Sequence, residues 1–399
     1  MNEEYPVLRS VSADLLRPQV HDRIIILTGS AAASRRMAAF LEAAGAAEVL
    51  SVYIEDVPTE TQQRFEAYDR ALTRPDEKLA NKIRAANPAG DGLVYAGSFS
   101  SVEQVLGRRV IGSRKQKHAD AERKQLQFEL SDTGGCIMEL DVGLPRFADH
   151  MVVQGIPNDS IAMATSHTYM LPAHADEQQT AYLIAQLRRD CRTAVVRPLD
   201  SGTPCTFYGF VTPEWIIDFG PVEALVYWHG TSLRLHAPGI LRPLLLDRDL
   251  LVTARTAVHK IAQRLLEVTG YIGAFGTDGV LCNRDYRIHE INPRVCAGFS
   301  LLDEIVPGVA PLAAVDLILR ECGPVAVTAL REPAKHIADI AQGDSSMRVK
   351  LWEPTRSFDE NVPDTGAWRQ DPATWAYEVR KALAAAGLVH ITDLAEVLR

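Results

Sequence analysis

The run RIIILT at residues 23–28 is the feature that most narrows the possible folds. Its interior is continuously aliphatic without polar alternation, which is typical of a strand buried on both faces of a parallel sheet. The alanine-rich stretch from Ser30 to Gly45 follows, and its composition predicts a helix that the glycine ends. An apolar run at 48–54 comes next, and the segment 93–97 followed by SVEQVL repeats the strand-then-helix plan. This alternation predicts an open α/β unit up to about residue 112.

Length and composition exclude several classes of protein. A chain of 399 residues predicts two or three packed units, and 47% hydrophobic with 23% charged residues is typical of a globular protein. The net charge of −9 disfavours nucleic acid and anionic lipid as partners. There is no signal peptide and no apolar run long enough to span a membrane, so we expect a cytoplasmic protein with no membrane partner. The six cysteines are widely spaced, which predicts unpaired thiols.

The rest of the chain gives a coarser pattern. The charged segment 113–130 predicts a solvated helix, and no order is assigned to residues 132–172. The further predicted elements are a helix at 176–191, strands at 193–197, 207–211, 215–218 and 223–228, and helices at 253–268, near 310–320 and at 371–387.

The stretch DGVLCNRDYRIHEINPR at residues 278–294 carries the chemistry. It reads as a hairpin around a polar turn, and a turn centred on Arg284 places Asp278 opposite Glu290. Their Cβ atoms would then lie about 5 Å apart. Asn292 shares the face of Glu290, because side chains alternate in a strand, and its opposite number is Gly276.

Two opposed carboxylates are destabilising unless a positive charge lies between them. Carboxylates with an amide oxygen suit Mg²⁺, so Asp278, Glu290 and Asn292 are candidate metal ligands. Arg294, one alternation further, is placed to meet an anion held by that metal. The alternative is two exposed acids on a hairpin, one of them paired to Arg284 or Arg287.

At these residues the sequence resembles the ATP-grasp superfamily, whose pattern is an acid in a strand, a short turn and then Glu-hydrophobic-Asn-Pro-Arg. The spacing is similar to that of the biotin carboxylase branch. The resemblance implies that Asp278, Glu290 and Asn292 hold Mg²⁺ ions bridging the phosphates of ATP. It also implies that Arg294 is the catalytic residue that stabilises charge at the reacting carboxylate.

Upstream the resemblance is looser. It implies that Arg197 takes the place of a nucleotide-binding lysine, and that Lys117 or Lys115 is an earlier ATP-binding lysine. Pro213 to Ile217 resembles a hinge that contacts adenine, which makes Glu214, Trp215 and Ile216 ATP-binding candidates. Glu223 resembles an acid near the ribose. The chain departs from the family where a glycine-rich phosphate loop is usual, because only LDSGTPCTFYGFVT separates Arg197 from the hinge.

The resemblance implies an α/β fold in which a Rossmann-like domain (1–112) precedes an ATP-grasp module of two α+β subdomains. These would be a nucleotide-binding small subdomain (113–217) and a large subdomain with the metal site (218–325). A C-terminal extension (326–399) is not explained by it.

The resemblance further implies a carboxylate–amine ligase that uses ATP and Mg²⁺, forms an acyl phosphate and joins amino acid or peptide-like small molecules, with a homodimer expected by analogy. Three alternatives stay open. They are a carboxylase or small-molecule kinase of the same superfamily, a non-catalytic nucleotide-binding protein, and a dinucleotide-dependent oxidoreductase suggested by LTGSAAAS at residues 27–34.

Overall fold

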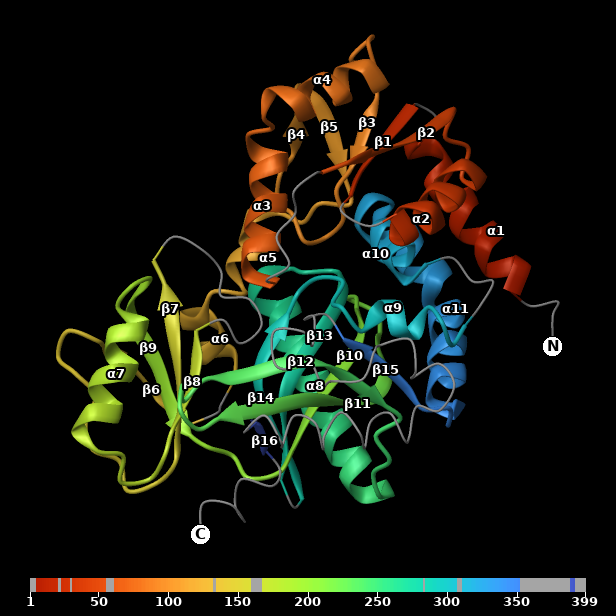
Figure 1. Cartoon of the computed structure of the whole chain (residues 1–399). Coiled ribbons are helices and arrows are strands. Elements are labelled where there is room, and N and C mark those ends of the chain that lie inside the picture. Colours follow the sequence, from red (N-terminus) through yellow and green to blue (C-terminus); the bar gives the residue numbers. More distant parts are fainter. Residues whose placement is uncertain are drawn as a thin grey trace.

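A computed structural model describes most of the chain (Figure 1). The described residues are 5–20, 23–28, 31–54, 61–131, 134–158, 167–282, 284–306, 311–351 and 388–391. The described strands form three sheets, which we call the N-terminal sheet, the small sheet and the large sheet. The chain is therefore a mixed α/β protein. In the described part, no helix is both long and apolar enough to cross a bilayer. All six cysteines are unpaired thiols, as predicted.

The N-terminal sheet has the strand order β2-β1-β3-β5-β4, and all neighbours except β4 and β5 run parallel. The predicted strand at 23–28 is an interior strand of this sheet and its four middle residues are buried, which confirms the predicted open α/β unit. The elements of this unit are α1 (Tyr5–Leu16), β1 (Arg23–Thr28), α2 (Ala31–Ala43), β2 (Glu48–Tyr53), α3 (Thr61–Thr73), α4 (Glu77–Ala86), β3 (Leu93–Tyr95), β4 (Gln104–Val105) and β5 (Arg108–Ile111).

The helix predicted after β3 is wrong. SVEQVL instead leads into the β4–β5 hairpin, whose turn is made by Leu106 and Gly107, both with positive φ. Val105 and Val110 are buried on the two arms. The tight turn and the alternating burial of the arms outweigh the helical tendency of the local sequence.

The small sheet has the order β6-β9-β7-β8 and is antiparallel throughout. Much of it comes from the segment that the sequence left unassigned. Its core packs on Trp228, Leu233 and Leu235 of the large sheet. The elements are β6 (Cys136–Glu139), β7 (Met151–Pro157), β8 (Thr168–Leu171), α7 (Glu177–Leu187) and β9 (Cys191–Pro198).

The large sheet carries helices on both faces. Its order is β14-β13-β10-β11-β12-β15, with β16 beside β11. One face packs on α8, and the other on α9 to α11. The strands are β10 (Thr203–Val211), β11 (Ile216–His229), β12 (Leu235–Arg242), β13 (Gly273–Cys282), β14 (Asp285–Asn292), β15 (Arg348–Leu351) and β16 (Leu388–His390). The helices are α8 (Arg248–Thr269), α9 (Phe299–Leu302), α10 (Leu312–Glu321) and α11 (Gly323–Gly343).

The described part of the C-terminal extension belongs to the same body. The helix α11 runs across residue 326, and β15 adds a strand to the large sheet. In Figure 1, α10 lies beneath α2, and one hydrophobic core joins both helices. The step from the small to the large sheet falls between Pro198 and Thr203, so residue 217 lies inside β11. The helix predicted at 371–387 lies outside the described residues.

The charged segment 113–130 is not a solvated helix, and that prediction is wrong. It forms two short helices, α5 (Gln116–Asp120) and α6 (Lys124–Leu130). Among its residues Arg114, Glu122, Lys124 and Gln127 are buried. These charged side chains have partners on other elements, and those interactions offset the cost of removing the charges from water.

Gln127 of α6 secures β14 at the edge of the large sheet. Its amide oxygen accepts from Ile291 N at 2.7 Å, and its amide nitrogen donates to Ile291 O at 2.6 Å. The side chain thus satisfies both backbone groups of Ile291, as a neighbouring strand would. This contact fixes the strand that carries Glu290 and Asn292.

We expect Gln127→Ala to lower the free energy of unfolding by roughly 1–3 kcal/mol, because it leaves buried backbone groups unpaired. Gln263→Ala is the control, since its amide contacts Glu267 on the exposed side of α8 at 2.9 Å. Chemical denaturation measures both. Equal, small losses in the two variants would show that Gln127 does not hold the strand.

Candidate active site

The β13–β14 hairpin brings the two acids together. Asp278 pairs with Glu290 and Gly276 with Asn292, which confirms the predicted register. The turn differs from the prediction, because Cys282 and Asp285 are already partners. A bulge between Asp278 and Gly279 offsets this shorter turn by one residue.

The bulge leaves His289 without a partner on β13, and this side chain meets Asp200 instead. His289 Nε2 lies 2.8 Å from Asp200 Oδ2, and Arg287 also pairs with Asp200. Asp200 belongs to the short link between β9 and β10. The link is therefore tied to the strand that carries Glu290, a contact that the sequence pattern did not reveal.

Asp278 lies in a polar but buried environment. Thr206 Oγ1 donates to one of its oxygens at 2.8 Å, and Asn292 Nδ2 donates to the other at 2.9 Å. Burial and, after it, the neighbouring charge of Glu290 together raise the pKa of Asp278 to about 7. At neutral pH a proton on Asp278 therefore relieves part of the repulsion between the two carboxyls.

Glu290 is held in the opposite protonation state. Burial alone raises its pKa, but the charges of Lys124 and Arg197 and a hydrogen bond from Asp278 outweigh burial and lower it. Its side chain is only 23% exposed. The alternative of two exposed, independent acids is wrong, because Glu290 pairs with Lys124 and Arg287 pairs elsewhere.

The donor set fits a hard divalent cation that also takes oxygens from a ligand. The described residues contain no group of three His, Cys, Asp or Glu side chains that could hold a metal. Asp278 and Glu290 supply two carboxylates, and Asn292 keeps its amide oxygen on the side away from its hydrogen bond to Asp278. Mg²⁺ typically combines one or two carboxylates with water and phosphate oxygens.

Lys124 and Arg197 form the positive side of the site. Lys124, at the start of α6, is buried and its ammonium contacts Glu290 Oε2. Arg197, on β9, acts electrostatically on Glu290 and Asp200. Its Nε is buried and has no hydrogen-bond partner among the described residues. Lys124 was missed from the sequence, although its spacing with Gln127 and Leu130 marks the buried face of α6.

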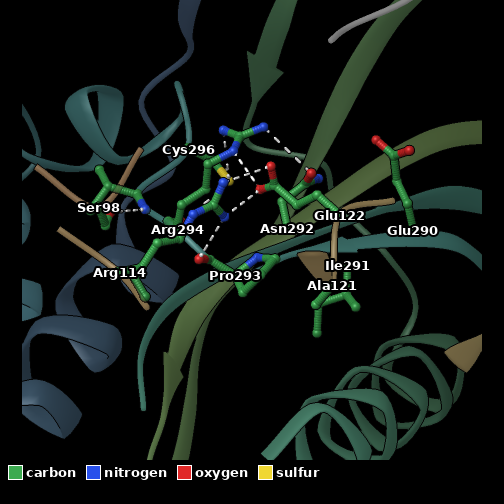
Figure 2. Close-up of polar contacts among 12 residues, drawn as sticks. Ser98, Arg114, Ala121, Glu122, Glu290, Ile291, Asn292, Pro293, Arg294 and Cys296 are labelled. Atoms are coloured by element: carbon green, nitrogen blue, oxygen red, sulfur yellow. Dashed lines mark hydrogen bonds and ion pairs between the residues drawn. The ribbon is translucent and has the colours of Figure 1, made fainter. Parts of the chain in front are cut away.

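Arg294 lies beside the acids in a network with Glu122 and Arg114, which Figure 2 shows. Arg294 Nε donates to Glu122 Oε1 at 2.7 Å. Burial raises the pKa of Glu122, but the two guanidinium groups outweigh burial and hold this pKa at about 2. Arg294 Nη2 lies 3.4 Å from Asn292 Oδ1, so the guanidinium borders the predicted metal ligands.

The other predicted ATP-binding residues are not brought to this cluster. Lys117 is exposed on α5 and Lys115 is exposed just before this helix, and Lys117 lies next to Gly270 at the end of α8. Glu223 pairs with Cys205, one residue from Thr206, so alternation places it on the face opposite Asp278. Its carboxylate lies 3.7 Å from His390 Nε2.

The predicted hinge lies at the far end of the β10–β11 hairpin. Val211 is about 17 Å along β10 from Thr206 at 3.4 Å per residue. Trp215 is buried and its indole donates to Val327 O at 2.7 Å, while Glu214 accepts from Thr328 at 3.2 Å. The structure thus packs Glu214 and Trp215 against α11, whereas Ile216 packs into the core on the α8 face of the large sheet.

We expect Asp278→Asn to stabilise the ligand-free protein at neutral pH. The folded pKa of about 7 lies above the ordinary 3.8, so the unfolded state binds fewer protons between these values. Stability therefore falls as pH rises from about 4 to 7, and the variant avoids this loss. The gain at pH 8 should be roughly 1–3 kcal/mol and should vanish below about pH 4.

Denaturation midpoints across pH measure this difference, with Asp141→Asn as the control because its side chain is 92% exposed. A pH-independent difference, or a loss of stability at pH 8, would contradict the shared-proton description of the pair.

Comparison with known proteins gives the fold. Neither a protein-family model nor a curated protein sequence matches this chain. Among solved structures, the L-amino acid ligase from Bacillus licheniformis has a TM-score of 0.53 at 12% identity, covering 79% of this chain and 78% of that chain. N5-carboxyaminoimidazole synthetase from Staphylococcus aureus complexed with ADP has a TM-score of 0.49 at 10% identity, covering 89% of this chain and 97% of that chain.

D-alanine–D-alanine ligase from Bacillus anthracis has a TM-score of 0.45 at 10% identity, covering 77% of this chain and 99% of that chain. At such low identity the likeness concerns architecture. The similarity to the L-amino acid ligase, together with the paired acids of β13 and β14, confirms the predicted resemblance at the level of fold. The chain shares the fold of that L-amino acid ligase.

Proposed function

We propose that the protein is an ATP-dependent ligase that joins a carboxylate to an amine, with ADP and phosphate as products. The observation that carries this proposal is the half-buried pair of Asp278 and Glu290, bordered by Lys124, Arg197 and Arg294. Such a set of charges suits a polyphosphate bound through a divalent cation. The carboxylates would bind the cation, and the basic side chains would contact the phosphates.

In this proposal Asp278, Glu290 and Asn292 hold Mg²⁺. When bound, Mg²⁺ offsets the charge of the phosphates and orients them. Lys124 would contact phosphate, and Arg197 would supply a second positive charge from the small sheet. Asp278 would act as a metal ligand in its deprotonated form, as carboxylate ligands do.

Arg294 meets the reacting carboxylate. A carboxylate oxygen attacks the terminal phosphorus of ATP, the bond to ADP breaks, and an acyl phosphate forms. The amine then attacks the acyl carbon, phosphate leaves with the bonding electrons, and the amine loses a proton. Arg294 stabilises the negative charge that develops on the acyl oxygen during these steps.

We infer that the substrates are small molecules and that the carboxylate is an amino acid or a peptide-like acid. The similarity to an L-amino acid ligase supports this inference. The parallel N-terminal sheet would act as the Rossmann-like domain that precedes the ATP-grasp module. The units of the small and the large sheet would be its two subdomains, with their boundary between Pro198 and Thr203 in place of the expected residue 217. Tail residues beyond 325 add α11 and β15 to the large sheet.

A non-catalytic nucleotide-binding protein is the second candidate. It is favoured by the short link between β9 and β10, which leaves only Leu199 to Gly202 where a phosphate loop is usual. The substitution of arginine for lysine at position 197 points the same way, because the two differ in shape and hydration. Tight binding of Mg²⁺·ATP without turnover across a broad substrate panel would favour this candidate.

The ligase proposal predicts that an acyl phosphate forms before any amine is added. In a single-turnover assay with γ-³²P-ATP, a panel of amino acids and a hydroxylamine trap, we expect ADP and a hydroxamate from at least one acid. Lys124→Met should reduce this rate by about 10²-fold or more, because it removes a charge next to the phosphates.

Lys260→Met is the matched control, since Lys260 is exposed on α8. Lys117→Met distinguishes the two lysines that compete for the ATP-binding role. Loss of activity in Lys117→Met but not in Lys124→Met would contradict the site as described. Failure of the wild-type protein to form any hydroxamate would count against the ligase.

A further inference from the structure

Glu122 lies between two guanidinium groups in the interior of the protein (Figure 2). Its Oε1 accepts from Arg294 Nε at 2.7 Å, and its Oε2 accepts from Arg114 Nη2 at 3.0 Å. The side chains of Glu122 and Arg114 are 2% and 1% exposed, and that of Arg294 is 14% exposed. Arg294 is thus the member of the network that borders solvent and the acid pair.

The N-terminal unit supplies a second support for Arg294. The loop after β3 places the ring of Phe99 at 5.2 Å from the guanidinium carbon. The next residue of the chain after Arg294 is anchored there too, because Val295 N donates to Ser98 Oγ at 2.8 Å. The orientation of Arg294 is therefore set by an aromatic face and a carboxylate that both come from outside the hairpin.

The contacts of Arg294 differ in strength from one edge to the other. Its Nε makes the short charge-assisted bond to Glu122, whereas Nη2 lies 3.4 Å from Asn292 Oδ1 and Nη1 lies 3.8 Å from Cys296 Sγ. Nη2 thus faces the predicted metal ligand Asn292, and Nη1 faces the thiol of Cys296. An incoming carboxylate oxygen can replace contacts of this length at little loss.

We propose that Glu122 is a positioning residue for the reaction, which fixes the Nε edge of Arg294 so that its terminal nitrogens face the reacting carboxylate. This inference rests on the proposed ligase function. Glu122 touches neither substrate nor metal in it, and acts only through Arg294. A catalytic group that is misplaced by about 1 Å can lower the reaction rate by about 10²-fold.

A purely structural role for Glu122 makes a different prediction. Burying the charge of Arg114 already requires a carboxylate, and removing one partner of a buried ion pair destabilises a fold. Structural loss would lower the stability and the amount of active enzyme, but it would not act selectively on the step that Arg294 serves.

The test compares Glu122→Gln and Glu122→Asp with wild type. Glutamine removes the charge but keeps the length of the side chain. Aspartate keeps the charge but shortens the reach toward Arg294. Because each variant keeps one of the two properties, we expect at least one of them to retain the fold. We expect the single-turnover rate of acyl-phosphate formation to fall about 30- to 100-fold, while the KM for Mg²⁺·ATP changes by less than about twofold.

A double-mutant cycle with Arg294→Lys identifies the route of the effect. If Glu122 acts through Arg294, Glu122→Asp should change the rate by less than about threefold in the Arg294→Lys background. Equal losses in both backgrounds, or a rise in the KM for ATP with an unchanged rate, would overturn the proposal. Arg348→Lys is the control for the arginine-to-lysine change, because Arg348 forms a separate ion pair with Asp344 at 3.4 Å.

Failure of this proposal is distinguishable from failure of the ligase function. If wild-type enzyme forms no acyl phosphate, the proposed function fails. If wild type is active and both Glu122 variants match it, Glu122 does not position Arg294 and the ligase proposal stands.

Discussion

The contact between the carboxyl groups of Asp278 and Glu290 is the constraint on which the rest of the site depends. Two acids directly opposed in a sheet repel each other, and burial strengthens the repulsion. The protein relieves it in two ways, with a proton on Asp278 and with the ammonium of Lys124 on Glu290. Under the proposed function, a metal ion would replace the proton and a phosphate would take over the contact with the ammonium.

The surrounding structure keeps this contact in register. The bulge after Asp278 sets which residues face each other, and Gln127 fastens the edge strand at Ile291. Asp200 ties the link between the small and large sheets to His289. These contacts come from different sheets and helices, so the position of Glu290 depends on how α6, the small sheet and the large sheet pack together. Without these contacts the two acids would still repel each other, but their carboxyl groups would not be held in a fixed position.

Some of this could be predicted from the sequence. The buried run at 23–28 and the hairpin register follow from local patterns, because continuous apolar runs and strand alternation are short-range signals. The segment 113–130 could not be assigned in this way. Its charge density is typical of a solvated helix, yet Glu122 and Lys124 are buried by partners that lie more than 160 residues away in the chain. Lys117 was the candidate because composition gives no means to rank one lysine above another.

The predicted adenine hinge shows the same limit. Residues 213–217 match a pattern of proline, acid and apolar residues. The indole of Trp215, however, donates a hydrogen bond to α11, an element that the sequence did not predict. A motif of this kind indicates a turn between strands, and the tertiary partners decide what the turn contacts. The acid pair was easier to predict because its partners lie within one hairpin.

The most direct test of the central claim is the binding of Mn²⁺, followed by electron paramagnetic resonance in the presence of a non-hydrolysable ATP analogue. Wild-type protein should bind Mn²⁺ with the analogue, and the combined variant Asp278→Asn, Glu290→Gln should lose this binding while its far-UV circular dichroism is unchanged. Unaltered Mn²⁺ binding in a folded double variant would contradict this claim, because the paired carboxylates would then not be the seat of the metal.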